Sequence, residues 1–402
     1  MGLDKESGGY LIDFLPLYYG RLFPGELMYR WLSYGNRDFF SHREFSFSLQ
    51  GDVYLRYQSF SSHEHFVEAL KHLKPEKIDI GAVYNQKPRT KELWTDLIPL
   101  QKEFVLDIDL TDYDDVRSCC QGAKVCEKCW KFIAVAVKII DASLRDDFGF
   151  QHLLWVFSGR RGVHCWVCDE TAINLDSHAR TAILGYLTVI RGGVNQAKKV
   201  KIENVDRLHP FLCRSLDIID EKFDEICRDD QNMLENGDIN FEMLPVEVKT
   251  AVRNSNDRFN DLMTYLHDNK KESKTLKRTT LCELKLQLCF PRLDVNVSKE
   301  LNHLLKSPFC IHPKTEKICV PFDPKKAFEF QPSQVPTITQ VLEEINSFDN
   351  DKKLQSKSNG KEDESAALED YKKTSLLPFI KEFENFVKNL EKTRTKISID
   401  EL

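Results

Sequence analysis

The chain divides into short stretches in which apolar and polar residues alternate and longer stretches with apolar residues at helical spacing. Alternation with period two, or a short apolar run between turn residues, predicts strands over 42–49, 52–60, 77–84, 104–110, 153–157, 163–167 and 289–297. Apolar residues three and four apart predict two short helices over 10–34, a helix over 130–144 and a helix after residue 375. The predicted strands therefore lie on both sides of a long helical region.

This pattern predicts five segments. Residues 1–173 and 287–346 carry the predicted strands and form two parts of one core, and residues 174–286 between them are helical and charge-rich, which predicts an inserted helical subdomain. Residues 347–370 have few large apolar groups, which predicts a flexible linker. Residues 371–402 contain an amphipathic helix whose apolar stripe docks either on the chain's own core or on a partner subunit. The stripe steps by four and three residues: Leu376, Ile380, Phe383, Val387 and Leu390.

One predicted strand, 104–110, carries two carboxylates on the same face. Val105, Asp107 and Asp109 share that face, because successive side chains of a strand point to opposite sides. Two ionised carboxylates roughly 7 Å apart repel each other. A hard divalent cation such as Mg²⁺ or Mn²⁺ would relieve this repulsion, and a pair of such ions roughly 4 Å apart suits phosphoryl or nucleotidyl transfer. The alternative is an exposed edge strand that is protected by its charge.

A glycine-enclosed pair of arginines follows in the turn 158–162. Such a turn lets backbone N–H groups and guanidinium groups converge on phosphate oxygens, and His164 emerges on the next strand. A solvated basic hairpin tip beside a buried histidine is the alternative.

Further polar candidates lie on other predicted strands and in one loop. Glu44 falls on the polar face of the strand 42–49, and Asp294 is a third carboxylate on a predicted strand with an apolar reverse face. His303, Lys306 and His312 supply basic and imidazole groups in the segment after Asp294.

Four cysteines lie within eleven residues, Cys119, Cys120, Cys126 and Cys129. Four thiolates suit a tetrahedral Zn²⁺ with bonds of about 2.3 Å, so the spacing predicts a structural zinc site. Buried free thiols are the alternative. Cys165 and Cys168 also have this short spacing, but in a strand they would point to opposite faces, and we expect them in the core.

Charge and hydropathy limit the class of protein. The 57 basic and 63 acidic residues give a net charge of −6, which argues against coating nucleic acid by electrostatics alone, so any such contact must be local. No run of about eighteen apolar residues exists to span a bilayer, and the first residues lack an apolar signal core. We therefore expect an intracellular protein with no membrane partner, whose twelve cysteines are reduced.

Over nearly its whole length the chain resembles the small, catalytic subunit of eukaryotic-type DNA primase. The motifs that carry the resemblance are His42–Phe47, Arg56–Phe60, Lys77–Tyr84, Asp107 and Asp109 with Thr111–Asp115, Ser158–Trp166, Pro291–Asp294, Lys306–Phe309 and Tyr371–Leu376. The region 190–285 resembles the family least.

The resemblance implies a mixed α/β fold, in which a primase-type catalytic core is built on a mixed β-sheet with flanking helices, an inserted helical subdomain and a zinc knuckle at 119–129. It implies a nucleotidyltransferase, a DNA-directed RNA polymerase of the primase type, which makes short RNA primers on single-stranded DNA from ribonucleoside triphosphates to initiate replication. It also implies a large regulatory subunit, the catalytic and accessory subunits of DNA polymerase alpha as partners, and a nuclear location.

Roles for individual residues also follow from the resemblance. Asp107, Asp109 and Asp294 would hold two catalytic Mg²⁺ or Mn²⁺ ions, Glu44 would be a further active-site acid, and the four cysteines would bind one structural Zn²⁺. The implied nucleotide-binding residues are Arg56, Ser158, Gly159, Arg160, Arg161, Gly162, Val163, His164, His303, Lys306 and His312.

Two other functions remain open on the residues alone. A sugar-nucleotide transferase also uses an Asp-x-Asp pair with Mn²⁺, although it would not explain Asp294 together with the arginine turn. A non-catalytic, zinc-stabilised assembly subunit is the second alternative, and the intact carboxylates argue against it. Unprimed synthesis of oligoribonucleotides on a single-stranded pyrimidine template separates all three.

Overall fold

A computed structural model describes residues 8–190, 196–234, 239–268, 273–359 and 369–394. Its strands form two sheets. The first has the order β2-β1-β3-β4, with β8 also paired to β3, and the second has the order β5-β7-β6. The strands are β1 (Arg43–Leu49), β2 (Val53–Gln58), β3 (Lys77–Tyr84), β4 (Pro99–Gln101), β5 (Phe104–Asp109), β6 (Leu153–Phe157), β7 (Gly162–Val167) and β8 (Leu305–Lys306). The mixed α/β class is confirmed, but all these strand pairs are antiparallel and fall in two sheets rather than in one mixed sheet.

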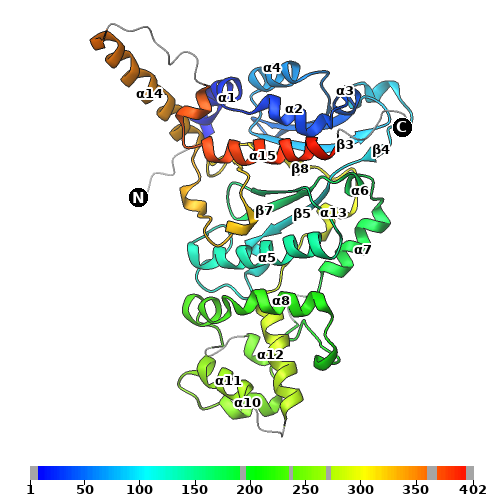
Figure 1. Ribbon diagram of the computed structural model, residues 1–402, viewed down its shortest axis with the longest axis vertical. Helices are drawn as coiled ribbons and strands as arrows, with labels where there is room; N and C mark the ends of the chain where they lie inside the picture. Colours follow the sequence, from blue (N-terminus) through cyan, green and yellow to red (C-terminus); the bar gives the residue numbers. More distant parts are fainter. Residues whose placement is uncertain (1–7, 191–195, 235–238, 269–272, 360–368, 395–402) are drawn as a thin grey trace.

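Helices cover both sheets and form a separate lobe (Figure 1). The α-helices are α1 (Gly8–Arg21), α2 (Gly25–Ser33), α3 (Arg37–Ser41), α4 (His63–Leu73), α5 (Glu127–Asp146), α6 (Glu170–Ile173), α7 (Ser177–Leu187), α8 (Pro210–Asp220), α9 (Ile239–Glu242), α10 (Val246–Val252), α11 (Arg258–His267), α12 (Lys274–Cys289), α13 (Val295–Lys299), α14 (Ile338–Asn359) and α15 (Leu377–Arg394). Short 3₁₀ turns are η1 (Pro88–Leu93), η2 (Leu110–Tyr113), η3 (Val205–Arg207), η5 (Pro324–Lys326), η6 (Pro332–Gln334) and η8 (Asp370–Lys373), and η4 (Glu225–Asp230) is π-helical. None of the helices in these ranges has the length and apolar character that a bilayer span requires.

The core of the second sheet is built from continuous apolar runs. β6 and β7 are buried along their whole length, and the 20-residue helix α5 adds twelve buried residues, among them the unbroken run 132–137. Cys165 and Cys168 are both fully buried, as predicted. This packing fixes β5 and β7, from which the candidate site is built.

The helical lobe consists of α8 and α10–α12, and lies below the second sheet in Figure 1. Helix α8 packs against α5, and α12 runs from the lobe back to the sheet. Helix α7 falls within the predicted insertion 174–286 but packs against α13, which in turn contacts β5. The domain boundaries themselves stay a prediction.

The prediction of a strand over 289–297 is wrong. Helix α12 extends to Cys289, and Asp294 is the N-cap of α13, where its Oδ1 accepts a hydrogen bond from the backbone N–H of Asn296 at 3.0 Å. Alternation over a few residues cannot be distinguished from a helix end followed by a cap, and Asp is among the preferred N-cap residues. Asp294 is therefore a cap carboxylate rather than a strand carboxylate.

The predicted linker 347–370 is helical in its first half. Helix α14 continues to Asn359, while 360–368 lie outside the described residues. A polar composition indicates little burial, but it does not prevent a helix where Gly and Pro are missing, and the next glycine is Gly360.

The amphipathic C-terminal helix is confirmed, and it docks on the chain itself. Ile380, Phe383, Val387 and Leu390 of α15 are buried, and Leu376 just before the helix is buried too. Phe383 packs edge-on against Trp31 of α2 at a ring-centroid distance of 5.7 Å. In Figure 1 the helix lies between the first-sheet layer and β7.

Candidate active site and zinc knuckle

The antiparallel pairing of β5 with β7 places acidic residues opposite the basic turn. Asp107 lies opposite His164 and Asp109 lies opposite Gly162, and His164 Nε2 is 3.7 Å from Asp107 Oδ1. Gly162 is required here, because a Cβ atom at this position would come within 2.4 Å of the carbonyl oxygen of Ile108. The predicted shared face of the two aspartates is therefore next to the hairpin.

Asp294 joins these carboxylates from the other end of the chain. Its backbone N–H donates to the carbonyl of Asp107 at 3.1 Å. Burial, together with the charges of Asp109 and Asp294, raises the pKa of the Asp107 carboxyl from 3.8 to about 7. Three carboxylates thus create a strongly negative region in a partly buried place.

The turn between β6 and β7 contacts both an aspartate of β5 and the segment that contains Lys306 and His312. Arg161 Nε donates to Asp109 Oδ2 at 2.8 Å, and both side chains are 31% exposed. Gly159 has φ +89°, and a Cβ there would lie 2.7 Å from His312 Cβ, so the turn needs glycine to pack against His312. Lys306 Nζ donates to the carbonyl of Ser158 at 2.6 Å. The structure thus brings Ser158, Lys306 and His312 together.

Three imidazoles near the turn are shifted toward the neutral form. Burial lowers the pKa of His164 to about 3, and the nearby Lys306 and Lys77 contribute. Burial and the charges of Lys306 and Arg160 lower the pKa of His312 to about 4. The pKa of His303 is also lowered, by burial and then by Lys102. Burial therefore favours the neutral form of all three imidazoles.

Glu44 and Arg56 form a pair within the first sheet. Glu44 is fully buried, and it accepts from Arg56 Nε at 3.0 Å, Arg56 Nη2 at 3.2 Å and the O–H of Tyr84 at 3.0 Å. A bulge between β1 and β2 produces this geometry, since Tyr57 takes a left-handed φ of 58° and its N–H also donates to Glu44, at 3.2 Å. The alternation did not reveal this burial, because the bulge supplies the partners.

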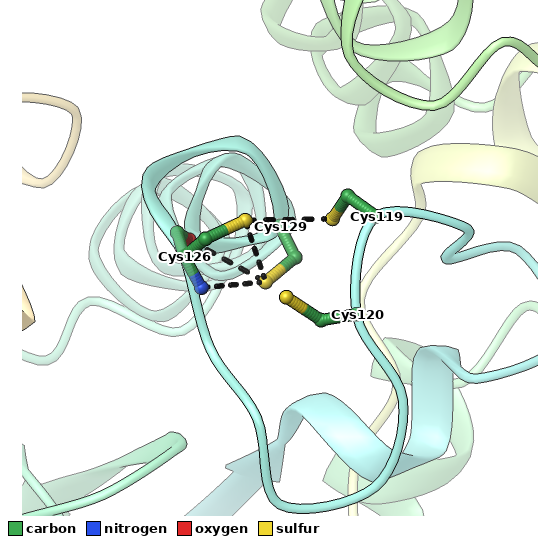
Figure 2. A group of neighbouring side chains, drawn as sticks. All are labelled: Cys119, Cys120, Cys126 and Cys129. Atoms are coloured by element: carbon green, nitrogen blue, oxygen red, sulfur yellow. Dashed lines mark hydrogen bonds between the residues drawn. The ribbon is translucent and has the colours of Figure 1, made fainter.

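Figure 2 shows the four predicted cysteines converging between a loop and the start of α5. All four Sγ atoms lie within 4.8 Å of one another, with Cys126 Sγ 3.6 Å from Cys119 Sγ and 3.8 Å from Cys129 Sγ. Sulfurs bonded at about 2.3 Å to a tetrahedral ion are about 3.8 Å apart, so the spacing fits zinc. The Cys126 N–H donates to Cys129 Sγ at 3.2 Å, which is a typical stabilisation of a thiolate.

A glutamine from the helical region supports this cluster. Gln231 is 1% exposed, and its Nε2 donates to Cys119 Sγ at 3.3 Å. Its Oε1 accepts from the backbone N–H of Ser118 at 2.9 Å and of Cys119 at 3.2 Å. The cysteine loop is thereby tied to residues more than one hundred positions away in the sequence.

Comparison with known proteins places this site in a family. The family model described as "DNA primase small subunit" matches residues 106–324, more than half of the chain. The chain is 41% identical over 419 aligned positions to the DNA primase small subunit of Drosophila melanogaster, covering 97% of this chain and 93% of the relative. This chain belongs to the DNA primase small subunit family. The Saccharomyces cerevisiae member is 36% identical over 412 positions, covering 96% and 94%, and the small subunit PriS of Methanobrevibacter smithii is 25% identical over 305 positions, covering 74% and 89%.

Membership confirms the resemblance derived from the motifs. As a primase small subunit, the chain is a nucleotidyltransferase that functions in primer synthesis for DNA replication. The family match includes the three aspartates, the arginine turn and the cysteine cluster within residues 106–324.

One of the predicted site residues is buried in the core, and two acidic residues that were not predicted lie near the site. Val163 of this primase chain is fully buried in the core, so only its backbone is available. Asp79 lies opposite Lys306 in the β3–β8 pair, and its Oδ2 accepts from the Tyr54 O–H at 3.1 Å. Asp112 also belongs here, because burial, Asp109 and Asp294 raise its pKa. In the predicted strand 77–84, Asp79 stands between Ile78 and Ile80, and this alternation could have identified it as a carboxylate on the face opposite the two isoleucines.

Proposed function

We propose that this chain is the catalytic subunit that starts RNA primers without a pre-existing 3′ end, on single-stranded DNA and from ribonucleoside triphosphates. It would act as a DNA-directed RNA polymerase of the primase type. The observation that carries the proposal is the juxtaposition of Asp107 and Asp109 on one strand face with Asp294 bonded to the same strand and the arginine turn beside them.

The carboxylates suit two hard divalent cations. Asp107, Asp109 and Asp294 offer oxygen ligands only, which Mg²⁺ and Mn²⁺ prefer. Burial and then the charges of Asp109 and Asp294 raise the pKa of Asp107. When bound, such ions activate the attacking 3′-hydroxyl and neutralise charge on the reacting phosphates.

The basic residues of the turn and of β8 would hold the triphosphate. Arg161 contacts Asp109 through Nε, so that its terminal nitrogens could bind phosphate oxygens, which guanidinium groups suit. Ser158, Lys306 and His312 meet at the turn, and a neutral His164 can donate one N–H without adding charge. Gly159 and Gly162 permit the close backbone approach.

Glu44 would act through Arg56 rather than as a metal ligand. Its oxygens accept from groups of the first sheet, and Arg56, 35% exposed, is the part of the pair that can reach a nucleotide. His303 lies near Lys102 and Asp294, at the edge of the same region. The zinc knuckle would be structural, because four thiolates leave no open position for water or substrate.

The name shared by the relatives, small subunit, implies a larger partner, and we propose that this chain forms a heterodimer with a large regulatory primase subunit. Further proposed partners are the catalytic and accessory subunits of DNA polymerase alpha, and the proposed location is the nucleus.

The test is unprimed synthesis by purified protein. A single-stranded pyrimidine template, labelled ribonucleoside triphosphates and Mg²⁺ or Mn²⁺ should yield short oligoribonucleotides, while Asp109→Ala should yield at least a hundredfold less. Asp146→Ala is the matched control, since this aspartate is 61% exposed at the end of α5. Absence of product with either metal, alone and with the large subunit, would contradict the proposal.

A further inference from the structure

A cavity of about 800 Å³ is lined by Gly159 and Arg160 of the arginine turn but by none of the three aspartates. One wall is the cysteine loop and the start of α5, and the other is the turn with residues 314–317. Val125 and Pro332 give it an apolar surface, and its volume falls within the usual range for small-molecule sites, roughly 300–1,000 Å³.

Four cations line this cavity: Lys128, Arg160, Lys314 and Lys317. Within the described ranges none of their side chains forms an ion pair, and Lys317 Nζ donates instead to the carbonyl of Pro332. Glu127 is the single acid among the lining residues. Cations that lack acidic partners around a recessed volume create a positive potential, which attracts anions.

The cavity is continuous with the turn that we assign to the triphosphate. Thr315 Oγ1 donates to the carbonyl of Gly159 at 2.7 Å, so the 314–317 loop is attached to the tip of the turn. Arg161 contacts Asp109, whereas the neighbouring Arg160 lines the cavity and is close enough to His312 to affect its charge. A phosphate group leaving the aspartates along this turn would therefore reach Arg160 and then the lysines.

We propose that this cavity is an accessory polyphosphate site, which takes the phosphates of an entering nucleoside triphosphate and of the departing pyrophosphate. The assignment to nucleotide traffic rests on the proposed function, whereas anion binding itself rests on the cavity and its cations. The apolar wall would contact the base or ribose of a nucleotide, and pyrophosphate would use the cations alone.

Titration calorimetry tests the site with two probes, inorganic pyrophosphate and ATP, in buffer without added divalent metal. Lys314→Glu and Lys128→Glu should each weaken binding roughly tenfold, because each removes one charge-assisted contact and adds a repulsive charge. Lys124→Glu is the matched control, since it makes the same charge change at an exposed position of the cysteine loop that does not line the cavity. It should keep the parent's affinity, and binding to the parent should weaken as salt rises.

The outcomes separate this inference from the proposed function. Weaker binding of either probe by Lys314→Glu but not by Lys124→Glu supports the site and identifies its ligand, even if the protein makes no primer. Unchanged binding of both probes in Lys314→Glu would overturn the inference, even in a protein that makes primers. Melting temperature and zinc content check that Lys128→Glu leaves the adjacent knuckle intact, and Lys314→Glu decides the question if it does not.

Discussion

At the scale of single residues, Asp107 is a carboxyl whose ionisation lowers the stability of the metal-free fold. A carboxyl whose pKa is raised from 3.8 to about 7 in the folded chain holds its proton more tightly there than in the unfolded chain. Its contribution to stability is therefore present at low pH and is lost as the pH rises through about 7. The negative charge that suits metal ions is one that the metal-free fold disfavours.

Asp107→Asn should remove this pH dependence. We expect the free energy of unfolding of the metal-free parent to fall by roughly 1 kcal/mol or more between pH 5 and 8. This estimate is kept low because the Asp107 side chain is 27% exposed. The melting temperature should fall by about 2 °C or more over the same range. The free energy of unfolding of the Asn variant should fall less over this pH range, and the variant should make no primer at any pH. Thermal melts across this range measure the effect, with Asp146→Asn as control. Parallel profiles for parent and Asp107→Asn would contradict the assignment.

Arg161→Lys tests the geometry of the guanidinium rather than its charge. Arg161 bonds Asp109 through Nε and retains terminal nitrogens for phosphate, whereas a single ammonium cannot serve both groups. We expect kcat/KM for nucleotide to fall about tenfold. Arg278→Lys, at an exposed ion pair with Asp206, should leave kinetics unchanged. If kcat/KM of Arg161→Lys equals that of the parent, the guanidinium group of Arg161 does not bind the nucleotide through its terminal nitrogens.

At the scale of elements, the sequence predicted those parts of the site that belong to regular strands. The face shared by Asp107 and Asp109 and the turn 158–162 could be read from alternation and glycine spacing, because β5, β6 and β7 are unbroken. Asp294 could be selected as a residue but not placed correctly, since its position depends on a helix cap. The burial of Glu44 depends on a bulge and on Arg56, and neither is visible in a local pattern.

The cysteine cluster is an element whose proposed structural role, binding zinc, can be separated from catalysis. Cys126→Ser should lose the zinc, about one ion per chain in the parent, and lower the melting temperature, with activity falling only as the folded fraction falls. Cys213→Ser, at an exposed cysteine outside the cluster, should change neither zinc content nor stability. Elemental analysis and melting curves measure both. A Cys126→Ser protein that keeps its zinc and melting temperature but loses all activity would indicate a catalytic role.

At the scale of the whole molecule, the site depends on two sheets being held together. Glu44, Arg56 and Lys306 belong to the first sheet, and the paired aspartates and His164 belong to the second. Sequence patterns describe each sheet separately and carry no information on their relative placement. Helix α15 contacts both sides: Glu391 pairs with Arg30 of α2 at 2.6 Å, and Arg394 donates to the carbonyl of Cys168, just after β7, at 2.9 Å.

Phe383→Ala tests whether this C-terminal helix aligns the two sheets. Phe383 is fully buried and packs on Trp31 and, at 5.3 Å between ring centroids, on Phe309, so its truncation should cost about 3–5 kcal/mol. Because the helix joins both layers, primer synthesis should fall at temperatures where circular dichroism still reports a folded protein. Lys381→Ala, at an exposed position of the same helix, should preserve activity and melting temperature. Full activity in Phe383→Ala up to the onset of its melting transition would mean that the sheets are aligned without α15.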